Sequence, residues 1–451
     1  MNFKILLIAT ILFAAIAVAT AQTNELPSAP SSSAISVPAS TPAPATSSVA
    51  AVPARVQPVI TAPRQNHHLS FRRDGMWLST EDGHTFVQAH GYVQADDRMF
   101  TSNIHGEGLD TFLFRRIRPL FQGTLFNNVD FRFMPDFGQN NPQIQEAYLE
   151  LKTLPFAKLR AGKFKEPIGL EVLRQDRDLT FPERSIASDL VPLRYIGAQL
   201  SGSILSNSIS YQGGYFDGSN DGSNGVFTQW ASGNEGAARA FFHPFATTHS
   251  GALRQLGLGI GGSAGSQRGA ISGLKTIGQT TFFKYSTGTV ADGEHNRLAP
   301  QAYYYVGPFG LMGEYTISSQ QVLNKGLTGR VRNEAWEVAG SFLLTGEKNG
   351  YSGVRPRNGF EPGRGFDHFG ALELAVRYAQ VRIGGGAFPN FANPSTAAQF
   401  AGGLGFGFNW YLTRYVKLQT DYEHTEFHMA PGAKSSLHSE NVLINQIQLS
   451  F

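Results

Sequence analysis

Residues 109–133 read LDTFLFRRIRPLFQGTLFNNVDFRF. When every second residue is taken, one row contains the apolar side chains Leu113, Ile117, Phe121, Leu125, Val129, Phe131 and Phe133. The positions between them are mainly polar, apart from Leu120, and include Arg116, Arg118, Gln122, Thr124, Asp130 and Arg132. A period of two indicates β-strands, and Asn127-Asn128 suits the positive φ angles of a tight turn. The stretch therefore predicts a hairpin with one apolar face and one face that carries arginines.

Such a hairpin fits two kinds of protein. In a soluble β-sandwich, the apolar face packs on a core and the arginines meet bulk water. In an outer-membrane barrel, the apolar face meets lipid and the arginines line a water-filled lumen. The hairpin alone favours the sandwich, so the choice depends on the rest of the chain.

Three features of the remaining chain favour the membrane barrel. The alternation recurs, with charged residues inside the polar rows, over 87–94, 147–152, 336–344, 372–378, 404–412, 416–423 and 446–451. Short turns, as at 154–155 and 307–308, alternate with long polar loops at 217–235 and 345–368, and outer-membrane barrels sort short turns and long loops to opposite ends. The chain also ends on Phe451, which closes an alternating strand and is read as a signal for barrel assembly.

The predicted fold class is all-β, a transmembrane antiparallel β-barrel of about 16 strands with an inward-folded constriction loop. The strand number follows because roughly 370 residues remain from Thr85 onward, at roughly 23 residues per strand with turns and loops included. A barrel of this size leaves an aqueous channel. The constriction loop is assigned to residues 164–194, which contain proline and alternate poorly.

The composition narrows the possible functions. The formal net charge of +3 is nearly balanced, so no nucleic-acid partner is indicated. The 50 Gly, 34 Phe and 15 Tyr fit sheets with many turns and aromatic girdles. The absence of Cys excludes disulfides and thiolate metal sites, and no metal ion, cofactor or catalytic group is predicted.

The N-terminal region divides into two predicted segments. Residues 1–21 predict a signal peptide, because Lys4 precedes a short apolar run that ends at a small-residue cleavage site, Ala19-Thr20-Ala21. Residues 22–66 are rich in Pro, Ser, Ala and Thr and predict a disordered linker, since such a segment cannot bury enough apolar area to order itself. The linker is either a passive leader or a periplasmic spacer that reaches the cell wall. The barrel is assigned to residues 67–451.

Several motifs, in order along the chain, resemble those of the phosphate-selective porin O/P family. They are GYVQAD at 91–96, FRRIR at 114–118, EAYL at 146–149, AGKFKEPIGLE at 161–171, ERS at 183–185, AWE at 335–337, LTGE at 344–347 and NWYL at 409–412. The resemblance covers residues 74–451. It implies a 16-stranded trimeric channel in the outer membrane, with inward-folded loops and basic residues that guide anions. The chain departs from the family before residue 74, where some relatives carry a coiled coil.

The face of the strand on which each basic residue lies indicates which residues line the pore. Arg116, Arg118 and Arg132 share one face of the first hairpins, and Lys152 and Arg160 continue the row on the next two strands. Rings of fixed cations favour the entry of anions, and the planar guanidinium group binds two phosphate oxygens at once. Arg115 has the opposite parity, so it either reaches the membrane rim or lies at a β-bulge.

The constriction segment supplies the second group of candidates. Its cations include Lys165, Arg174, Arg177 and Arg184. With Arg194 they oppose six acidic residues, which favours a transverse field and broad permeability over strict selection. The alternative is a salt-bridged loop whose charges do not contact solute.

The predicted function is passive diffusion of small anions, with phosphate and polyphosphate as candidates, through the outer membrane of a Gram-negative-type bacterium. The expected partners are these anions, outer-membrane lipid and lipopolysaccharide, and further copies of the chain in a homotrimer. Two alternatives remain open, a non-selective solute porin and a plugged barrel that acts as an adhesin or scaffold. An enzyme is not predicted, because no histidine lies in a recognisable nucleophile context.

Overall fold

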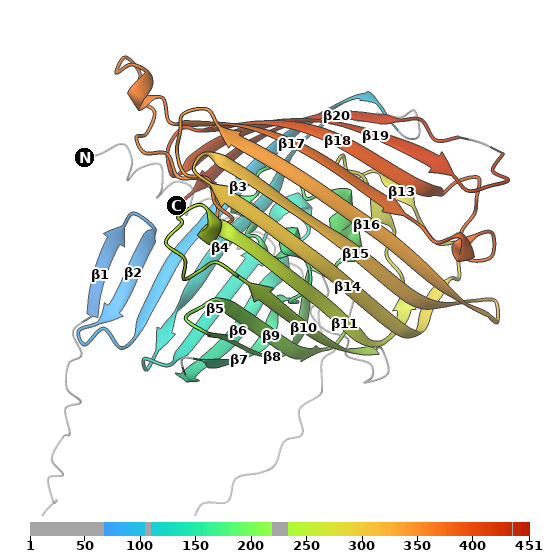
Figure 1. Cartoon of the computed structure of the whole chain (residues 1–451), viewed down its shortest axis with the longest axis horizontal. Coiled ribbons are helices and arrows are strands. Elements are labelled where there is room, and N and C mark those ends of the chain that lie inside the picture. The colour runs from blue at the N-terminus through green and yellow to red at the C-terminus, as the bar shows by residue number, and fades with distance from the viewer. Residues whose placement is uncertain (1–66, 104–109, 155, 219–232, 435) are drawn as a thin grey trace, which may run out of the picture. The chain divides into compact units, whose positions relative to one another are not determined.

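The computed structural model describes residues 67–103, 110–154, 156–218, 233–434 and 436–451 (Figure 1). The predicted signal peptide and linker lie outside the described residues and stay predictions. The strands are β1 (His67–Arg72), β2 (Gly75–Thr80), β3 (Phe86–Ser102), β4 (Thr111–Leu125), β5 (Val129–Asp136), β6 (Gln143–Leu154), β7 (Ala157–Lys165), β8 (Arg194–Ile204), β9 (Ile209–Phe216), β10 (Gly233–Phe242), β11 (Leu256–Ala270), β12 (Leu274–Lys275), β13 (Thr281–Phe283), β14 (Val290–Val306), β15 (Phe309–Asn324), β16 (Leu327–Leu343), β17 (Ala371–Arg382), β18 (Ala398–Tyr411), β19 (Val416–Met429) and β20 (Glu440–Ser450).

The helical segments are short. They are α2 (Leu170–Leu173) and the 3-10 turns η1 (Gly138–Asn140), η2 (Asp176–Asp178), η3 (Ile186–Leu190), η4 (Leu253–Gln255), η5 (Phe366–His368) and η6 (Gly385–Ala387). Among the described residues, no helix has the length and apolar character needed to cross a membrane.

Strands β3 to β11 and β14 to β20 form one closed antiparallel barrel of 16 strands, which confirms the predicted fold class (Figure 1). The barrel closes where β20 pairs with β3, with Gln446 opposite Asp96 and Leu449 opposite Val93. Beyond β20, Phe451 exchanges two backbone hydrogen bonds with Gly91, of 3.0 and 2.9 Å. Every strand of the barrel therefore has two neighbours, the arrangement that strands need to cross a bilayer.

The alternation of the sequence appears as an outer and an inner face of the wall. On β17 and β18, Leu374, Phe406 and Phe408 are exposed on the outside, whereas Glu373 and Arg377 are buried on the inside. Successive side chains of a strand point to opposite faces, so a row of charges can line the lumen while the outer surface stays apolar.

A β-bulge in β4 changes the predicted parity. Gln94 pairs with Arg116 and Ala95 with Phe114, so Arg115 is the extra residue. Of the two alternatives for Arg115, the bulge is the one observed. The bulge also reverses the strand before it, because Phe112 and Phe114 are exposed and Leu113 lies opposite the buried Asp96. The prediction that Leu113 shares the outer face with Ile117 is therefore wrong.

The β4–β5 turn also differs slightly from the prediction. Positive φ angles occur at Phe126 (53°) and Asn127 (71°), rather than at the two asparagines. The turn lies one residue earlier because Leu125 pairs with Val129.

The two ends of the barrel carry different connections. The β4–β5, β8–β9 and β14–β15 turns and the C-terminus lie at one end, which we call the terminal end, and the opposite end is the loop end. Residues 344–370, between β16 and β17, lie at the terminal end, and β15 and β16 are joined at the loop end by only Lys325-Gly326. The expectation that 345–368 belongs with the other long loops is therefore wrong. This segment turns back toward the lumen, since the Tyr351 hydroxyl donates to the carbonyl of Leu170, in the connection between β7 and β8, at 2.6 Å.

An apolar core fills part of the lumen toward the loop end. The β11–β14 connection, which contains β12 and β13, contributes Phe282 and Phe283, and η3 contributes Ile186. They pack on inward-facing side chains of the wall, which include Val331, Ala335, Val381, Ala401, Val442 and Ile444. The apolar core thus fills the lumen beside these strands at this level.

Candidate functional site

The connection between β7 and β8, residues 166–193, crosses the lumen as predicted. Strands from several parts of the wall hold it through its backbone. Asn409 on β18 and Gln419 on β19 donate to the Thr180 carbonyl at 2.8 and 2.9 Å. On β15, the Glu314 carboxylate accepts from the Leu170 and Glu171 amides at 2.6 and 3.1 Å. These contacts satisfy backbone groups that a buried loop cannot pair by itself, so the loop is a fixed part of the channel.

Asp176 is the centre of a cluster of arginines inside the barrel. Its carboxylate lies 2.6 Å from Arg184, 3.4 Å from Arg194 and 3.7 Å from Arg116, and it also contacts Arg118. The carboxylate is buried, and burial alone would raise its pKa. The guanidinium groups of Arg184 and Arg118 outweigh burial and hold the pKa of Asp176 well below its usual range. Asp176 is therefore a fixed negative charge among four positive ones.

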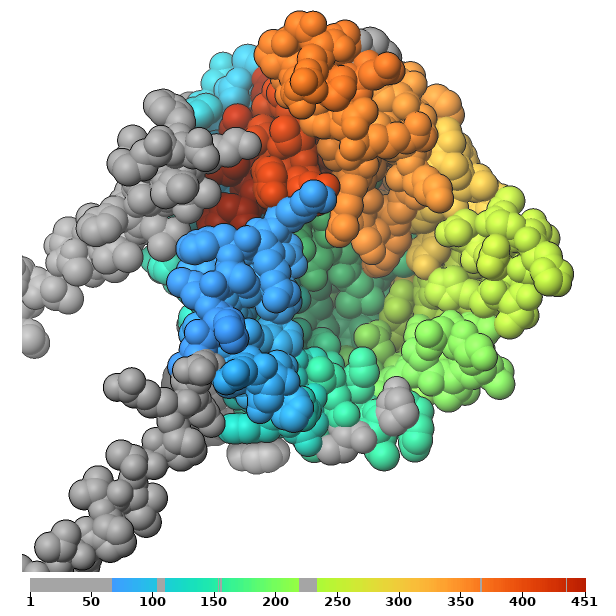
Figure 2. Space-filling view, turned by 90° about the vertical axis from the view of Figure 1, so that its left-hand side faces the viewer, coloured from blue at the N-terminus to red at the C-terminus, as the bar shows by residue number. Residues whose placement is uncertain are grey.

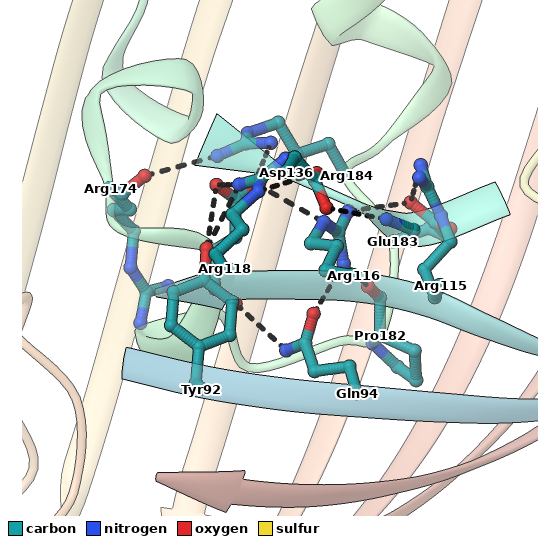
Figure 3. A network of polar contacts seen from close by, with 12 residues as sticks. Tyr92, Gln94, Arg115, Arg116, Arg118, Asp136, Arg174, Pro182, Glu183 and Arg184 are labelled. Atoms are coloured by element: carbon teal, nitrogen blue, oxygen red, sulfur yellow. Dashed lines mark hydrogen bonds and ion pairs between the residues drawn. The ribbon is translucent and has the colours of Figure 1, made fainter. Parts of the chain in front are cut away.

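Glu183 is a second centre, on the other side of Arg116. Figure 3 shows Arg115 and Arg116 converging on its carboxylate. Arg116 lies 3.1 Å away, Arg98 of β3 lies 2.7 Å away, and the Arg115 side chain reaches it from the bulge of β4. Although burial opposes ionisation, Arg115 and Arg116 lower the pKa of Glu183. The bulge thus lets two consecutive arginines reach one carboxylate.

The predicted pore-lining residues are all placed beside carboxylates. Arg116 and Arg118 are only 2% and 5% exposed, and Arg118 also lies 2.7 Å from Asp136. On the following strands, the pairs are Arg132 with Glu146 at 3.2 Å, Lys152 with Asp130 at 2.6 Å and Arg160 with Glu150 at 2.6 Å. The geometry thus gives each of these cations a partner inside the protein, and their contact with solute stays a prediction.

The predicted cations of the constriction segment have varied surroundings. Lys165 donates to the Arg174 carbonyl, and Arg174 donates to the Tyr351 and Asp178 carbonyls at 3.1 and 2.5 Å. Arg184 is bound to Asp176, as described above, and its side chain is 11% exposed. Arg177 keeps a 35% exposed side chain, 3.9 Å from Asp178. Arg177 is therefore better placed than Arg184 to meet a solute in water.

The wall formed by β15 to β19 has the opposite charge balance. Its buried carboxylates are Glu314, Glu337, Glu373, Asp421 and Glu423, and its buried cations are Arg377 and Lys417. Arg377 lies 3.2 Å from Glu423, 3.7 Å from Glu171 and 3.9 Å from Asp421. Arginines on β3, β4 and β8 thus face a wall richer in carboxylates, with the constriction loop between them. Ionised carboxylates on this wall and the arginines opposite them produce a transverse field.

The sequence analysis did not identify most of the ion-pair partners inside the barrel. Arg98 and Asp96 share the parity of Gln94, so the alternation of β3 could have identified them. The clustering around Arg377 could not have been found in this way, because Glu171, Asp421 and Glu423 come from segments far apart in the chain.

A cavity of about 350 Å³ opens between the constriction loop, the β11–β14 connection and the wall. Its charged lining residues are Arg115, Arg116, Arg184, Lys275, Arg297, Glu183 and Asp189. The lining thus holds more cations than carboxylates, although Arg184 and Arg297 are also paired with Asp176 and Glu235, which lie outside the lining. At the terminal end, Figure 2 shows a hollow between the blue N-terminal hairpin and the orange segment around residue 350.

A closed 16-stranded barrel with an apolar outside, a charged lumen and a loop folded across it defines an outer-membrane porin. The family model of the phosphate-selective porins O and P matches residues 87–451, and the chain belongs to this family. The chain is 22% identical to Porin O of Pseudomonas aeruginosa over 387 residues, which cover 78% of this chain and 85% of that protein.

Solved structures support the same fold. The outer-membrane channel DcaP of Acinetobacter baumannii has a TM-score of 0.54 at 11% identity and covers 83% of this chain and 99% of its own. The anion-selective porin from Comamonas acidovorans has a TM-score of 0.51 at 12% identity, with 81% of this chain and 99% of its own covered. Family and fold together make this chain an outer-membrane anion porin.

Proposed function

We propose that the channel conducts small anions in general, phosphate among them, and that fixed charges at the constriction loop set its selectivity. The cavity beside the loop carries this proposal, because its lining holds more cations than carboxylates, which favours the entry of anions over cations. Phosphate, the anion for which the porin O and P family is named, suits such a lining, since guanidinium groups bind its oxygens in pairs.

Strict phosphate selection is not part of the proposal. The arginines at the loop already have carboxylate partners, so a phosphate ion must compete with Asp176 or Glu183 for each guanidinium group. Competition of this kind weakens each site, and weak sites allow fast passage. We therefore expect chloride and phosphate both to pass, with phosphate slowing the chloride current only at high concentration.

Reconstitution of the purified protein in planar bilayers tests the proposal. A salt gradient should give a reversal potential of the sign of an anion-preferring channel. Replacement of Arg116 and Arg118 by alanine should reduce or invert that preference, because Asp176 and Glu183 lose cations. The matched control is Arg332→Ala, since Arg332 pairs with Glu334 in an exposed position. A cation-preferring wild-type channel, or a double variant with unchanged preference, would contradict the proposal.

One observation favours a second candidate, a plugged barrel that acts as an adhesin or scaffold. The apolar core toward the loop end removes part of the lumen from water. The same bilayer recording separates the two functions, because a folded, inserted protein without conductance would support the plug.

We further infer that the chain works as a homotrimer with its terminal end in the periplasm. Short turns on the periplasmic side are usual in such barrels, and the β4–β5, β8–β9 and β14–β15 turns lie at the terminal end. The predicted removal of residues 1–21 would then leave the linker 22–66 on the periplasmic side. Intact mass measurement of the exported protein tests the removal of residues 1–21. Crosslinking in membranes tests the homotrimer.

A further inference from the structure

The hairpin of β1 and β2 adds to the barrel wall without closing it. β2 pairs with the first residues of β3, with Met76 opposite Ala89 and Leu78 opposite Val87. From Gly91 onward, Phe451 and β20 occupy the same edge of β3. The hairpin therefore continues the wall by two strands at the terminal end, where Figure 1 places it beside the barrel.

One face of this hairpin is apolar and exposed. Leu69 lies opposite Leu78, and Phe71 lies opposite Met76, so the four side chains share a face. All four are exposed, Phe71 by 80% and Leu69 by 58%. The other face is already occupied, since Trp77 stacks on Phe86 at 4.8 Å and Arg72 covers the Trp77 ring at 4.5 Å.

The apolar face is continuous with the outer surface of the barrel. Pairing places Phe71, Met76 and Ala89 in one row across the strands, and the row continues through Phe121 to Phe133. Residues directly opposite one another in an antiparallel sheet share a face. Phe121 and Phe133 are exposed on the outside of the barrel. The face of the hairpin is thus an extension of the surface that meets lipid.

The tip of the hairpin carries two arginines and one aspartate. β1 ends at Arg72, and Arg73 and Asp74 join the two strands; within the described residues, no ion pair links either arginine to a carboxylate. Arginines beside an apolar face favour the boundary of acyl chains and anionic headgroups, and Asp74 offsets part of their charge.

We propose that the β1–β2 hairpin is a membrane-surface anchor, whose face of Leu69, Phe71, Met76 and Leu78 contacts the lipid leaflet at the terminal end of the barrel. Continuity of the exposed apolar row with the barrel's outside favours lipid over a second copy of the chain as the occupant. The proposal rests on the membrane location of the barrel and is independent of which ions pass through it.

The natural lack of cysteine permits a direct test. The full chain carrying Phe71→Cys is labelled with an environment-sensitive fluorophore and reconstituted in vesicles of phosphatidylethanolamine and phosphatidylglycerol. Ser70→Cys, on the opposite face of β1, is the matched control, and Phe133→Cys reports insertion of the barrel. Lipids with nitroxide-labelled acyl chains should quench position 71 at least about twofold more than position 70, and aqueous iodide should give the reverse order.

Two results would overturn the anchor. Quenching of position 71 by iodide but not by the labelled lipids would mean that the face is free in water. Protection of position 71 from both quenchers would mean that protein covers it, which points to a second copy of the chain. If position 133 also escaped the labelled lipids, the membrane location of the barrel would fail instead, so the two failures are distinguishable.

Discussion

Arg115 and Asp176 show how single residues define the interior. Arg115 occupies the extra position of a bulge and so turns toward Glu183, although its parity predicts the outer face. Asp176 gathers guanidinium groups from β4, from β8 and from its own loop. A buried carboxylate among several arginines balances charges that would otherwise repel one another, and it sets how many cations a passing solute experiences.

Replacement of Asp176 by asparagine should raise the preference for anions severalfold, because the side chain keeps its shape but no longer neutralises the arginines around it. The same change should destabilise the loop by about 3–5 kcal/mol, the usual cost of breaking a buried ion pair. Reversal potentials and thermal unfolding in detergent measure the two effects. Asp178→Asn is the control, since its pair with Arg177 is long at 3.9 Å, and an equal response of both variants would refute the role of Asp176.

At the scale of elements, strands and loops depend on each other. The bulge of β4 brings two arginines to Glu183, and the loop that carries Glu183 is held in turn by β15, β18 and β19. The β12–β13 hairpin fills the lumen opposite this loop with aromatic side chains. The open path through the barrel is therefore the space that the β7–β8 and β11–β14 connections do not fill.

Deletion of Arg115 should leave the native barrel able to form, because Arg116 still pairs with Gln94 and Phe114 with Ala95, so the strand before the bulge keeps its faces and only the contact with Glu183 is lost. Arg115→Ala keeps the bulge and removes only the pair with Glu183, so it should still fold. Heat-modifiable migration in SDS gels distinguishes a closed barrel from an unfolded chain. A deletion variant that migrates as an unfolded chain would show instead that closure of the barrel requires the bulge itself.

Phe283→Ala should widen the channel on the side of the apolar core. Phe283 is 1% exposed, and removal of a buried phenylalanine costs about 3–5 kcal/mol, which loosens the β12–β13 hairpin. We expect a larger and noisier single-channel conductance. The neighbouring Lys284 is exposed, so Lys284→Ala should conduct like the wild type, and an identical conductance of both variants would contradict this role for the core.

At the scale of the whole molecule, closure of the barrel determines the hydrogen bonding of the end strands and the side chains that meet across the lumen. Only when β20 reaches β3 do the first and last strands supply one another with hydrogen bonds. Closure also sets which side chains meet across the lumen, since arginines near the start of the chain then face carboxylates of β15 to β19. A barrel without unpaired edges is the form in which strands can cross a bilayer.

Gly91→Val should weaken this seam, because a Cβ atom at Gly91 would lie 2.6 Å from the Arg118 carbonyl oxygen and 3.2 Å from the Phe451 ring. We expect a lower midpoint of thermal unfolding in detergent and slower folding into vesicles. Gly213→Val is the matched control, since a Cβ atom there meets nothing within 4 Å. Equal midpoints for the two variants would mean that the seam tolerates strain.

The sequence by itself determined the class of fold, the number of strands, the inward-folded loop and the faces of most strands. Alternation with a period of two is a local property, so it can be recognised without knowledge of distant residues. Leu372 to Tyr378 and Leu404 to Leu412 follow it without interruption. One extra residue, Arg115, breaks the local pattern in β4, and the assignment of Leu113 to the outer face failed there. A bulge cannot be recognised from the residue types, yet it reverses the face of each residue that precedes it in the strand.

Only the tertiary structure decided which charges meet. Arg116 and Glu183 are separated by 67 residues and Arg377 and Glu171 by far more, so neither pairing leaves a trace in the local pattern. The end at which residues 344–370 emerge also depends on counting every strand, which a sequence with irregular connections does not permit. Coulombic attraction acts through space rather than along the chain, and the closed wall with its folded-in loops is what sets those distances.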